Sequence, residues 1–257
     1  MKRAGILRTS RWLLAVVAAA APLVASADVG NEPRIALIID DLGYRWNEGL
    51  RATRLPGAVT VAILPHTAHT VALAREANDR GKEILLHLPM QPIEPDEQPG
   101  PGALDVYQTR TEFEAVLADD LASVPFVRGV NNHMGSLLTR QLGAMHWLME
   151  DLRERGSLYF LDSFTTPASV GLEVAREEGV PALRRDVFLD PDREPAAIAS
   201  QWNRLLGRAK LNGFAVGIGH PYPATLDLLE RVLPSVGADG VVLVPLSALM
   251  PKRRAAP

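Results

Sequence analysis

The stretch "IALIIDDLGYRW" (residues 35–46) contains the pattern that decides the fold. Five apolar residues, three of them isoleucine, predict a buried β-strand that ends in two adjacent aspartates, Asp40 and Asp41, and a glycine. Two carboxylates this close repel each other, so one of them resists ionisation unless a positive charge lies between them. The pair therefore raises the question of whether a metal ion binds at the end of this strand.

The same alternation continues along the chain. Short runs rich in Val, Ile and Leu are followed by longer amphipathic segments, which is typical of a parallel sheet covered by helices. Seven or eight such units predict an α/β fold with a closed or nearly closed barrel, and an open doubly wound sheet is the alternative. The predicted strands are residues 35–39, 59–64, 84–88, 127–131, 158–161, 183–188, 215–218 and 241–244; the predicted helices are 46–53, 68–80, 111–123, 140–155, 168–178, 195–210 and 224–233.

The first 27 residues have the composition of a secretory signal peptide. Four basic residues precede the apolar run "WLLAVVAAAAPLVA", and "ASA" at residues 25–27 is a small-residue cleavage signal. The run is short for a membrane-spanning helix and Pro22 interrupts it, although an uncleaved N-terminal anchor is the alternative. We therefore expect cleavage before Asp28, export to the periplasm or another location outside the cytoplasm, and one catalytic domain over residues 28–257 with no integral membrane segment.

Composition excludes some classes of protein. Removing the first 27 residues, which carry four basic and no acidic groups, takes the formal net charge from −3 to −7. An acidic domain of this kind is a poor candidate for nucleic acid binding, which requires a basic surface. The chain has no cysteine, so disulfides are excluded and His, Asp and Glu are the good metal ligands that remain.

Polar side chains follow five of the predicted strands. In a parallel α/β barrel the functional site lies at the carboxyl ends of the strands, so these side chains are expected to meet at one rim. The segment from Gln91 to Asp105, dense in Pro, Gly and acidic residues, is predicted to be a loop over this rim. The strand-end residues are Asp40 and Asp41; His87 in "EILLHLPMQP"; Asn131, Asn132 and His133 in "GVNNHMGS"; Asp162 and Ser163 in "LYFLDSFT"; and His220 in "FAVGIGHPYPAT".

Each of these residues has a purely structural interpretation as well. An aspartate after a strand is often a helix N-cap or a turn former, and Asp162 could cap the helix that follows it. His87 could be a hydrogen-bonded core histidine, and His220, which precedes a proline, could simply end its strand. The structural interpretations would have to hold at five strand ends together, which favours a functional site.

Ligand chemistry suggests how such a site would work. One carboxylate and two imidazoles on a divalent metal leave positions open for water and substrate. The metal lowers the pKa of bound water toward about 7 and polarises a carbonyl oxygen. A second aspartate outside the coordination sphere can accept the proton of that water, and a histidine on the opposite side can protonate the leaving group. In this hypothesis the cation also offsets the repulsion between the two carboxylates.

The ordered motifs "DDLG … HLPMQP … NNHMGS … LDSFT … GHPYPAT" resemble the divergent polysaccharide deacetylase family, a bacterial envelope group, over about residues 34–249. The resemblance implies a distorted (β/α) barrel of seven or eight mainly parallel strands. It also implies Asp40 as the catalytic base, Asp41, His87 and His133 as ligands of zinc or a related divalent metal, and His220 as the acid. Asp162 would orient a catalytic group, with Asn132 or Ser136 contacting substrate.

One position departs from the pattern of polysaccharide deacetylases. Their second motif ends in two histidines four residues apart; His87 matches the first, but Gln91 stands where the second is expected, and glutamine is a poor zinc ligand. His133 is the candidate that replaces it. The predicted activity is metal-dependent removal of acetyl groups from an envelope polysaccharide or peptidoglycan-type glycan. The alternatives are a non-catalytic metal- or glycan-binding protein on the same scaffold and a hydrolase of another ester or amide.

Overall fold

The computed structural model describes Met1 and residues 32–252. The predicted signal peptide, apart from Met1, lies outside the described residues. Within the part that is described, no helix is long and apolar enough to cross a membrane.

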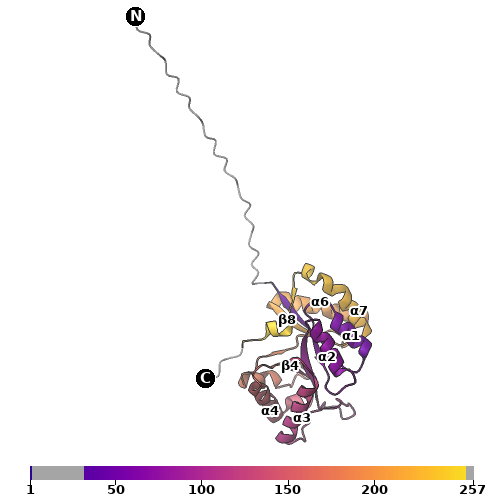
Figure 1. Cartoon of the computed structure of the whole chain (residues 1–257), viewed down its shortest axis with the longest axis vertical. Helices are drawn as coiled ribbons and strands as arrows, with labels where there is room; N and C mark the ends of the chain where they lie inside the picture. The colour runs from indigo at the N-terminus through magenta and orange to yellow at the C-terminus, as the bar shows by residue number, and fades with distance from the viewer. Residues whose placement is uncertain (2–31, 253–257) are drawn as a thin grey trace. The chain divides into compact units, whose positions relative to one another are not determined.

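A single parallel sheet forms the centre of the domain (Figure 1). Eight strands are hydrogen-bonded in the order β6-β5-β4-β3-β2-β1-β8-β7, and β9 pairs with the first two residues of β1, ahead of the point where β2 begins. Every strand pairing is parallel, as the alternation of apolar runs and helices predicted. The strands are β1 (Arg34–Leu42), β2 (Thr60–Ile63), β3 (Glu83–Met90), β4 (Val127–Met134), β5 (Tyr159–Asp162), β6 (Ala182–Arg184), β7 (Val187–Phe188), β8 (Phe214–Gly219) and β9 (Val242–Leu243).

The sheet curls into a barrel with one seam, between β6 and β7. These two strands end the hydrogen-bonded order, yet only Arg185 and Asp186 separate them in the chain. The N–H of Arg185 donates to Asp162 O at the end of β5, and the N–H of Asp186 donates to Val216 O in β8. Because adjacent residues bond to opposite ends of the strand order, the sheet must close on itself. The prediction of a distorted barrel is therefore confirmed, and the open sheet is the wrong alternative.

Helices cover the outside of the barrel (Figure 1). Each predicted helix is present, with ends that differ by a few residues. Two ends have clear local causes: Thr109 and Glu112 form a capping box at the start of α3, and Gly213 ends α6 in the left-handed conformation. The helices are α1 (Trp46–Arg54), α2 (Thr70–Asp79), α3 (Arg110–Ser123), α4 (Leu142–Glu154), α5 (Gly171–Glu177), α6 (Pro195–Asn212) and α7 (Pro223–Val232).

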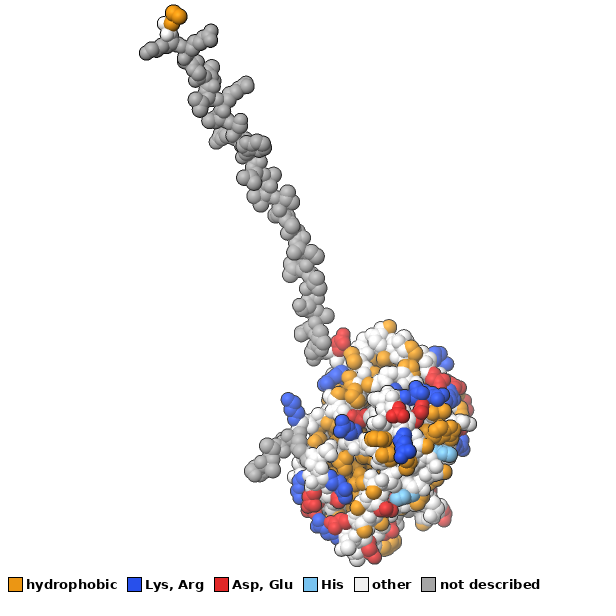
Figure 2. Space-filling model, viewed as in Figure 1, with side chains coloured by type: hydrophobic (Ala, Val, Ile, Leu, Met, Phe, Trp, Pro, Cys, Tyr) orange, Lys and Arg blue, Asp and Glu red, His pale blue; other side chains and the backbone are white. Residues whose placement is uncertain are grey.

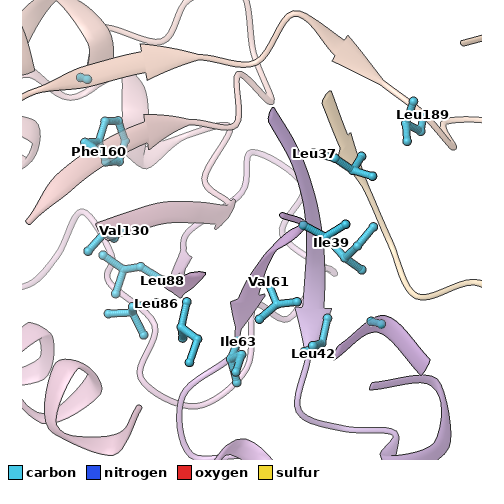
Figure 3. Packing of buried hydrophobic residues seen from close by; sticks show 14 of the residues in the cluster. Leu37, Ile39, Leu42, Val61, Ile63, Leu86, Leu88, Val130, Phe160 and Leu189 are labelled. Carbon is cyan, nitrogen blue, oxygen red and sulfur yellow. The ribbon is translucent and has the colours of Figure 1, made fainter. Parts of the chain in front are cut away.

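Alternate residues of each strand belong to two separate apolar clusters, because successive side chains of a strand point to opposite faces. The larger cluster lies between sheet and helices and contains Leu37, Ile39, Leu86 and Phe160 (Figure 3). The smaller one fills the barrel interior and contains the intervening strand residues Ile38, Leu85, Leu161, Val216 and Ile218. The apolar interior leaves room for polar side chains only at its ends.

The surface carries charges of both signs. In Figure 2, Lys and Arg side chains lie among Asp and Glu side chains over the visible face of the domain. This mixed distribution differs from the basic stripe that nucleic acid binding requires.

Candidate metal centre

Every second side chain of a strand faces the barrel interior, and most of the predicted site residues occupy such positions. Asp40 follows Ile38 by two positions, His87 follows Leu85, and His220 follows Ile218, and in each case the earlier residue belongs to the interior cluster. The polar side chains therefore stand at the carboxyl end of the barrel interior, directly above its apolar filling. This is the rim that the sequence predicted.

Asp41 reaches the same site by a backbone irregularity. In a regular strand, neighbouring aspartates would point to opposite faces. The register of β1 against β2 shifts between Ile39 and Leu42, and Asp41 has a φ of 59°. A non-glycine residue in this left-handed region costs about 1–3 kcal/mol and persists where the surroundings enforce it, most often at functional sites. The bulge therefore brings two adjacent carboxylates to one side of the strand.

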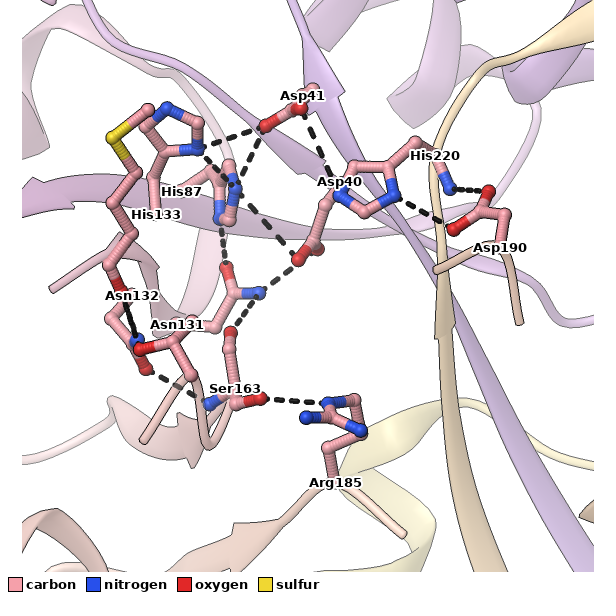
Figure 4. Close-up of polar contacts among 12 residues, drawn as sticks. Asp40, Asp41, His87, Asn131, Asn132, His133, Ser163, Arg185, Asp190 and His220 are labelled. Carbon is pink, nitrogen blue, oxygen red and sulfur yellow. Dashed lines mark hydrogen bonds and ion pairs between the residues drawn. The ribbon is translucent and has the colours of Figure 1, made fainter. Parts of the chain in front are cut away.

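Asp41, His87 and His133 converge on one point (Figure 4). The Oδ1 atom of Asp41 lies 2.9 Å from Nδ1 of His133 and 3.1 Å from Nε2 of His87, and these two nitrogens are 3.1 Å apart. In a tetrahedral zinc site, ligand atoms about 2.05 Å from the ion lie about 3.3 Å from one another. The three atoms would need to separate by only a few tenths of an ångström to hold a divalent cation, so this donor set fits the implied metal.

Asn131 fixes the orientation of His87. Nδ1 of His87 lies 2.9 Å from the amide oxygen of Asn131, and the amide nitrogen of Asn131 donates to Asp40 Oδ1 at 2.9 Å. With Nδ1 donating to Asn131, Nε2 is the His87 atom that faces Asp41 and His133, where it would offer its lone pair to a metal after losing any proton it shares with Asp41. Outer partners of this kind orient metal ligands in known metal sites. Asn131, which is fully buried, therefore links the ligand set to Asp40.

The two aspartates have opposite pKa shifts. Burial raises the pKa of Asp40, and the nearby His87 and His220 offset this only in part. Burial also acts to raise the pKa of Asp41, but hydrogen bonds from His133 and His87 outweigh it and hold the pKa well below its usual value. Asp41 is thus favoured as a permanently ionised group and Asp40 as one that takes up a proton more readily. Oδ2 of Asp40 lies 3.7 Å from Nε2 of His87, beside the three converging atoms.

His220 lies on the other side of the aspartate pair and has a buried carboxylate partner (Figure 4). Its Nδ1 is 2.9 Å from Asp190 Oδ1, and its Nε2 is 3.8 Å from Asp41 Oδ2. Burial lowers the pKa of His220, but Asp190 and the aspartate pair outweigh this and raise it to about 9. Asp190 is itself fixed by hydrogen bonds from His220 N and Thr225 Oγ1, both at 2.7 Å.

Asp190 is not among the site residues predicted from the sequence. The signal was present, because Asp190 ends the apolar run "VFL" just as Asp162 ends its own run. Its place in the site depends on the pairing of β7 with β8, which brings it beside the end of β8 that carries His220. Strand pairing of this kind cannot be read from a single sequence.

Asp162 is not brought to the cluster. It shares a strand face with Phe160, which packs outside the barrel, so its side chain points away from the interior. Its carboxylate accepts hydrogen bonds from Phe164 N and Ser169 Oγ, both at 2.8 Å, in the loop before α5. These contacts close the turn after β5 and do not cap α5, whose N-cap residue is Val170 with no side-chain cap hydrogen bond, so the helix cap that the sequence left as the alternative is not found. The next residue, Ser163, lines the pocket instead.

Gln91 has a separate role from the metal cluster. Its side-chain oxygen accepts a hydrogen bond from Val106 N at 3.0 Å, and its carbonyl oxygen accepts from Leu137 N and Leu138 N. Gln91 therefore anchors the loop that follows it, while His133 belongs to the cluster that could hold a metal.

A pocket of about 360 Å³ opens above the cluster. Its floor includes Asp40, His87, His133 and His220, and Glu94 and Glu97 from the predicted rim loop form part of its wall. Asn132 and Ser136, the weaker substrate-contact candidates, also line it.

The comparisons with known proteins agree with this fold. The chain belongs to the divergent polysaccharide deacetylase family, whose model matches residues 37–250. It is 37% identical over 236 residues to the uncharacterized protein YibQ of Escherichia coli, which covers 91% of this chain and 72% of YibQ. An uncharacterized protein of Haemophilus influenzae is 34% identical over 208 residues, covering 81% of this chain and 74% of that protein.

A solved structure shares most of the fold. The uncharacterized protein ATU2773 from Agrobacterium tumefaciens superposes with a TM-score of 0.82 at 26% sequence identity, covering 87% of this chain and 91% of ATU2773. This chain therefore shares its overall fold with ATU2773.

Proposed function

We propose that this protein is an exported, metal-dependent hydrolase that removes N- or O-acetyl groups from an envelope polysaccharide or peptidoglycan-type glycan. The observation that carries the proposal is the meeting of Asp41, His87 and His133 at one point, with Asp40 beside them and His220 opposite. Membership of the polysaccharide deacetylase-like family supports a carbohydrate substrate. Export rests on the composition of the first 27 residues.

The residues divide the chemistry between them. A divalent cation held by Asp41, His87 and His133, for which zinc suits the His and Asp donors, would supply a Lewis acid that polarises the acyl carbonyl and acidifies water. Asp40 accepts the proton of the attacking water, and Asn131 holds the Asp40 carboxylate in place. His220, protonated and paired with Asp190, gives a proton to the departing oxygen or nitrogen of the sugar.

Acetate release tests the proposal directly. Purified protein is loaded with zinc and incubated with acetylated xylan, chitin oligosaccharides and peptidoglycan fragments. We expect acetate from at least one of these, with release abolished by chelation and lowered by at least about 100-fold in Asp40→Asn, because general base catalysis contributes 10²–10⁴-fold. Asp79→Asn, at the exposed end of α2, is the matched control and should keep full activity.

A zinc-loaded protein that releases no acetate from any of the three polymers would contradict the proposal. Stoichiometric metal with glycan binding and no acetate release would favour the non-catalytic alternative. The presence of Gln91 in place of a motif histidine is the feature that suggests this alternative.

A further inference from the structure

A second pocket, lined largely by arginines, lies at the seam of the barrel. It has a volume of about 390 Å³, and its lining includes Arg184, Arg185, Arg204 and Arg208 together with Phe188 and one carboxylate, that of Asp186. We call it the arginine pocket. The metal centre described above uses none of the four arginines as a ligand.

The fold explains why the arginines meet. Arg184 ends β6, and Arg185 lies in the link between β6 and β7. These two strands are not paired with each other, so the sheet is open at this point. Arg204 and Arg208 are four residues apart in α6 and therefore share one face of that helix. Two basic residues of the seam thus face two basic residues of the helix.

The positive charge of this pocket is only partly neutralised. Asp186 is 3.9 Å from Nη1 of Arg208, a weak contact. Arg185 donates to the carbonyl oxygens of Ser163 and Phe164 at 2.7 and 3.0 Å, and the guanidinium of Arg184 stacks 4.2 Å from the Phe164 ring. Arg185 is attracted by the carboxylates of Asp40, Asp162 and Asp186 and repelled by Arg204, and within residues 32–252 Arg204 itself forms no ion pair or hydrogen bond. Like charges gathered in a concave site attract an anion, and guanidinium groups match the geometry of carboxylates and phosphates.

The arginine pocket adjoins the pocket above Asp40, His87 and His220, which we call the catalytic pocket. Phe188 lines both, and its ring centroid lies 5.1 Å from that of His220. Ser163, whose carbonyl oxygen Arg185 holds, also lines the catalytic pocket. A ligand with its acyl group above the aspartate pair can therefore extend past Phe188 to the guanidinium groups.

We propose that the arginine pocket binds a carboxylate or phosphate group carried by the glycan whose acyl group enters the catalytic pocket. The assignment of the catalytic pocket rests on the proposed function, whereas anion binding at the seam rests on the arginines alone. The substrate class is accordingly an acetylated glycan with an anionic substituent, and a neutral acetylated polymer is a poorer ligand.

Calorimetric binding to the full, metal-loaded chain tests this proposal with two matched pairs of ligands. One pair is the disaccharide of N-acetylglucosamine and N-acetylmuramic acid, which carries a carboxylate, and the neutral disaccharide of N-acetylglucosamine. The other is N-acetylglucosamine 6-phosphate and N-acetylglucosamine. In at least one pair we expect tighter binding of the anionic member, with an advantage that shrinks as salt is added.

Arg204→Glu should weaken binding of the anionic ligand by at least about tenfold, because a charge-assisted hydrogen bond is lost and the charge is reversed. It should leave binding of the neutral ligand unchanged. Arg75→Glu is the control, since Arg75 is also exposed within a helix, α2, and lies outside the pocket. The proposal is wrong if neither anionic ligand binds more tightly than its neutral partner, or if Arg75→Glu has the same effect as Arg204→Glu.

Binding of inorganic phosphate distinguishes a site for free anions from a site for the anionic group of a glycan. If phosphate binds in an Arg204-dependent manner while neither sugar pair shows a difference, the pocket serves a free anion and the glycan assignment is overturned. These measurements do not require acetate release. An absence of deacetylation together with a clear preference for anionic sugars would thus reject the proposed function and retain the arginine pocket.

Discussion

His133→Ala removes one of the three side chains that meet at the candidate metal centre. Nδ1 of His133 lies 2.9 Å from Asp41 Oδ1 and 3.1 Å from His87 Nε2, so the change deletes a ligand atom from the centre of the cluster. It also removes a hydrogen bond that lowers the pKa of Asp41, so protons compete better with the metal for that carboxylate. Loss of an outer partner of a metal ligand weakens binding by 10–100-fold. Loss of a ligand itself should exceed about 100-fold.

The matched variant is Gln91→Ala, at the position where polysaccharide deacetylases carry their second motif histidine. The side chain of Gln91 bonds to Val106 N and not to the cluster, so its removal should change metal affinity by less than about threefold and reduce stability by about 1 kcal/mol for one lost hydrogen bond. A large loss of zinc affinity in His133→Ala and a small one in Gln91→Ala would therefore identify His133 as a metal ligand and Gln91 as a residue that holds the loop.

Zinc titration against a chromophoric chelator gives the affinities, and elemental analysis after dialysis gives the stoichiometry. Circular dichroism shows whether each variant is folded. The ligand assignment is wrong if folded His133→Ala keeps wild-type zinc affinity, or if Gln91→Ala loses as much affinity as His133→Ala. Either result would mean that the three converging side chains are not the ligand set.

Two further predictions concern buried carboxylates. Asp190→Asn should lower acetate release by at least about tenfold and move the alkaline limb of its pH profile to lower pH, because protonated His220 is lost as pH rises through a pKa near 9 that Asp190 helps to raise; an unmoved limb would exclude His220 as the acid. Burial and the neighbouring Asp119 raise the pKa of Asp120 from 3.8 to about 8, despite His66 Nε2 at 2.9 Å from its Oδ1. The native state therefore binds this proton more tightly than the unfolded state, so the free energy of unfolding should fall as pH rises from about 4 to about 8. Urea unfolding across that range should give a flatter dependence for Asp120→Asn, and parallel curves for the two proteins would contradict this account.

The positions of polar residues after apolar runs were sufficient to predict which residues lie at the rim of the barrel. Parallel strands share one carboxyl end, so Asp40, His87, His133 and His220 could be assigned to one rim without knowing which strands are neighbours. The alternation of faces explains the less accurate prediction at β5. Asp162 and Ser163 both end that strand, but only Ser163 shares the interior face with Leu161, which belongs to the interior cluster.

The amino-acid pattern was enough to predict the alternation of strands and helices, and with it a parallel sheet with polar residues at the strand ends, because apolar runs and their polar ends are local properties of the chain. Only the tertiary structure decided which residues touch. The left-handed turn at Asp41, the pairing that brings Asp190 to His220, and the seam that gathers four arginines all depend on strand register and closure. Register and closure are set by packing between distant segments, which a local pattern does not encode.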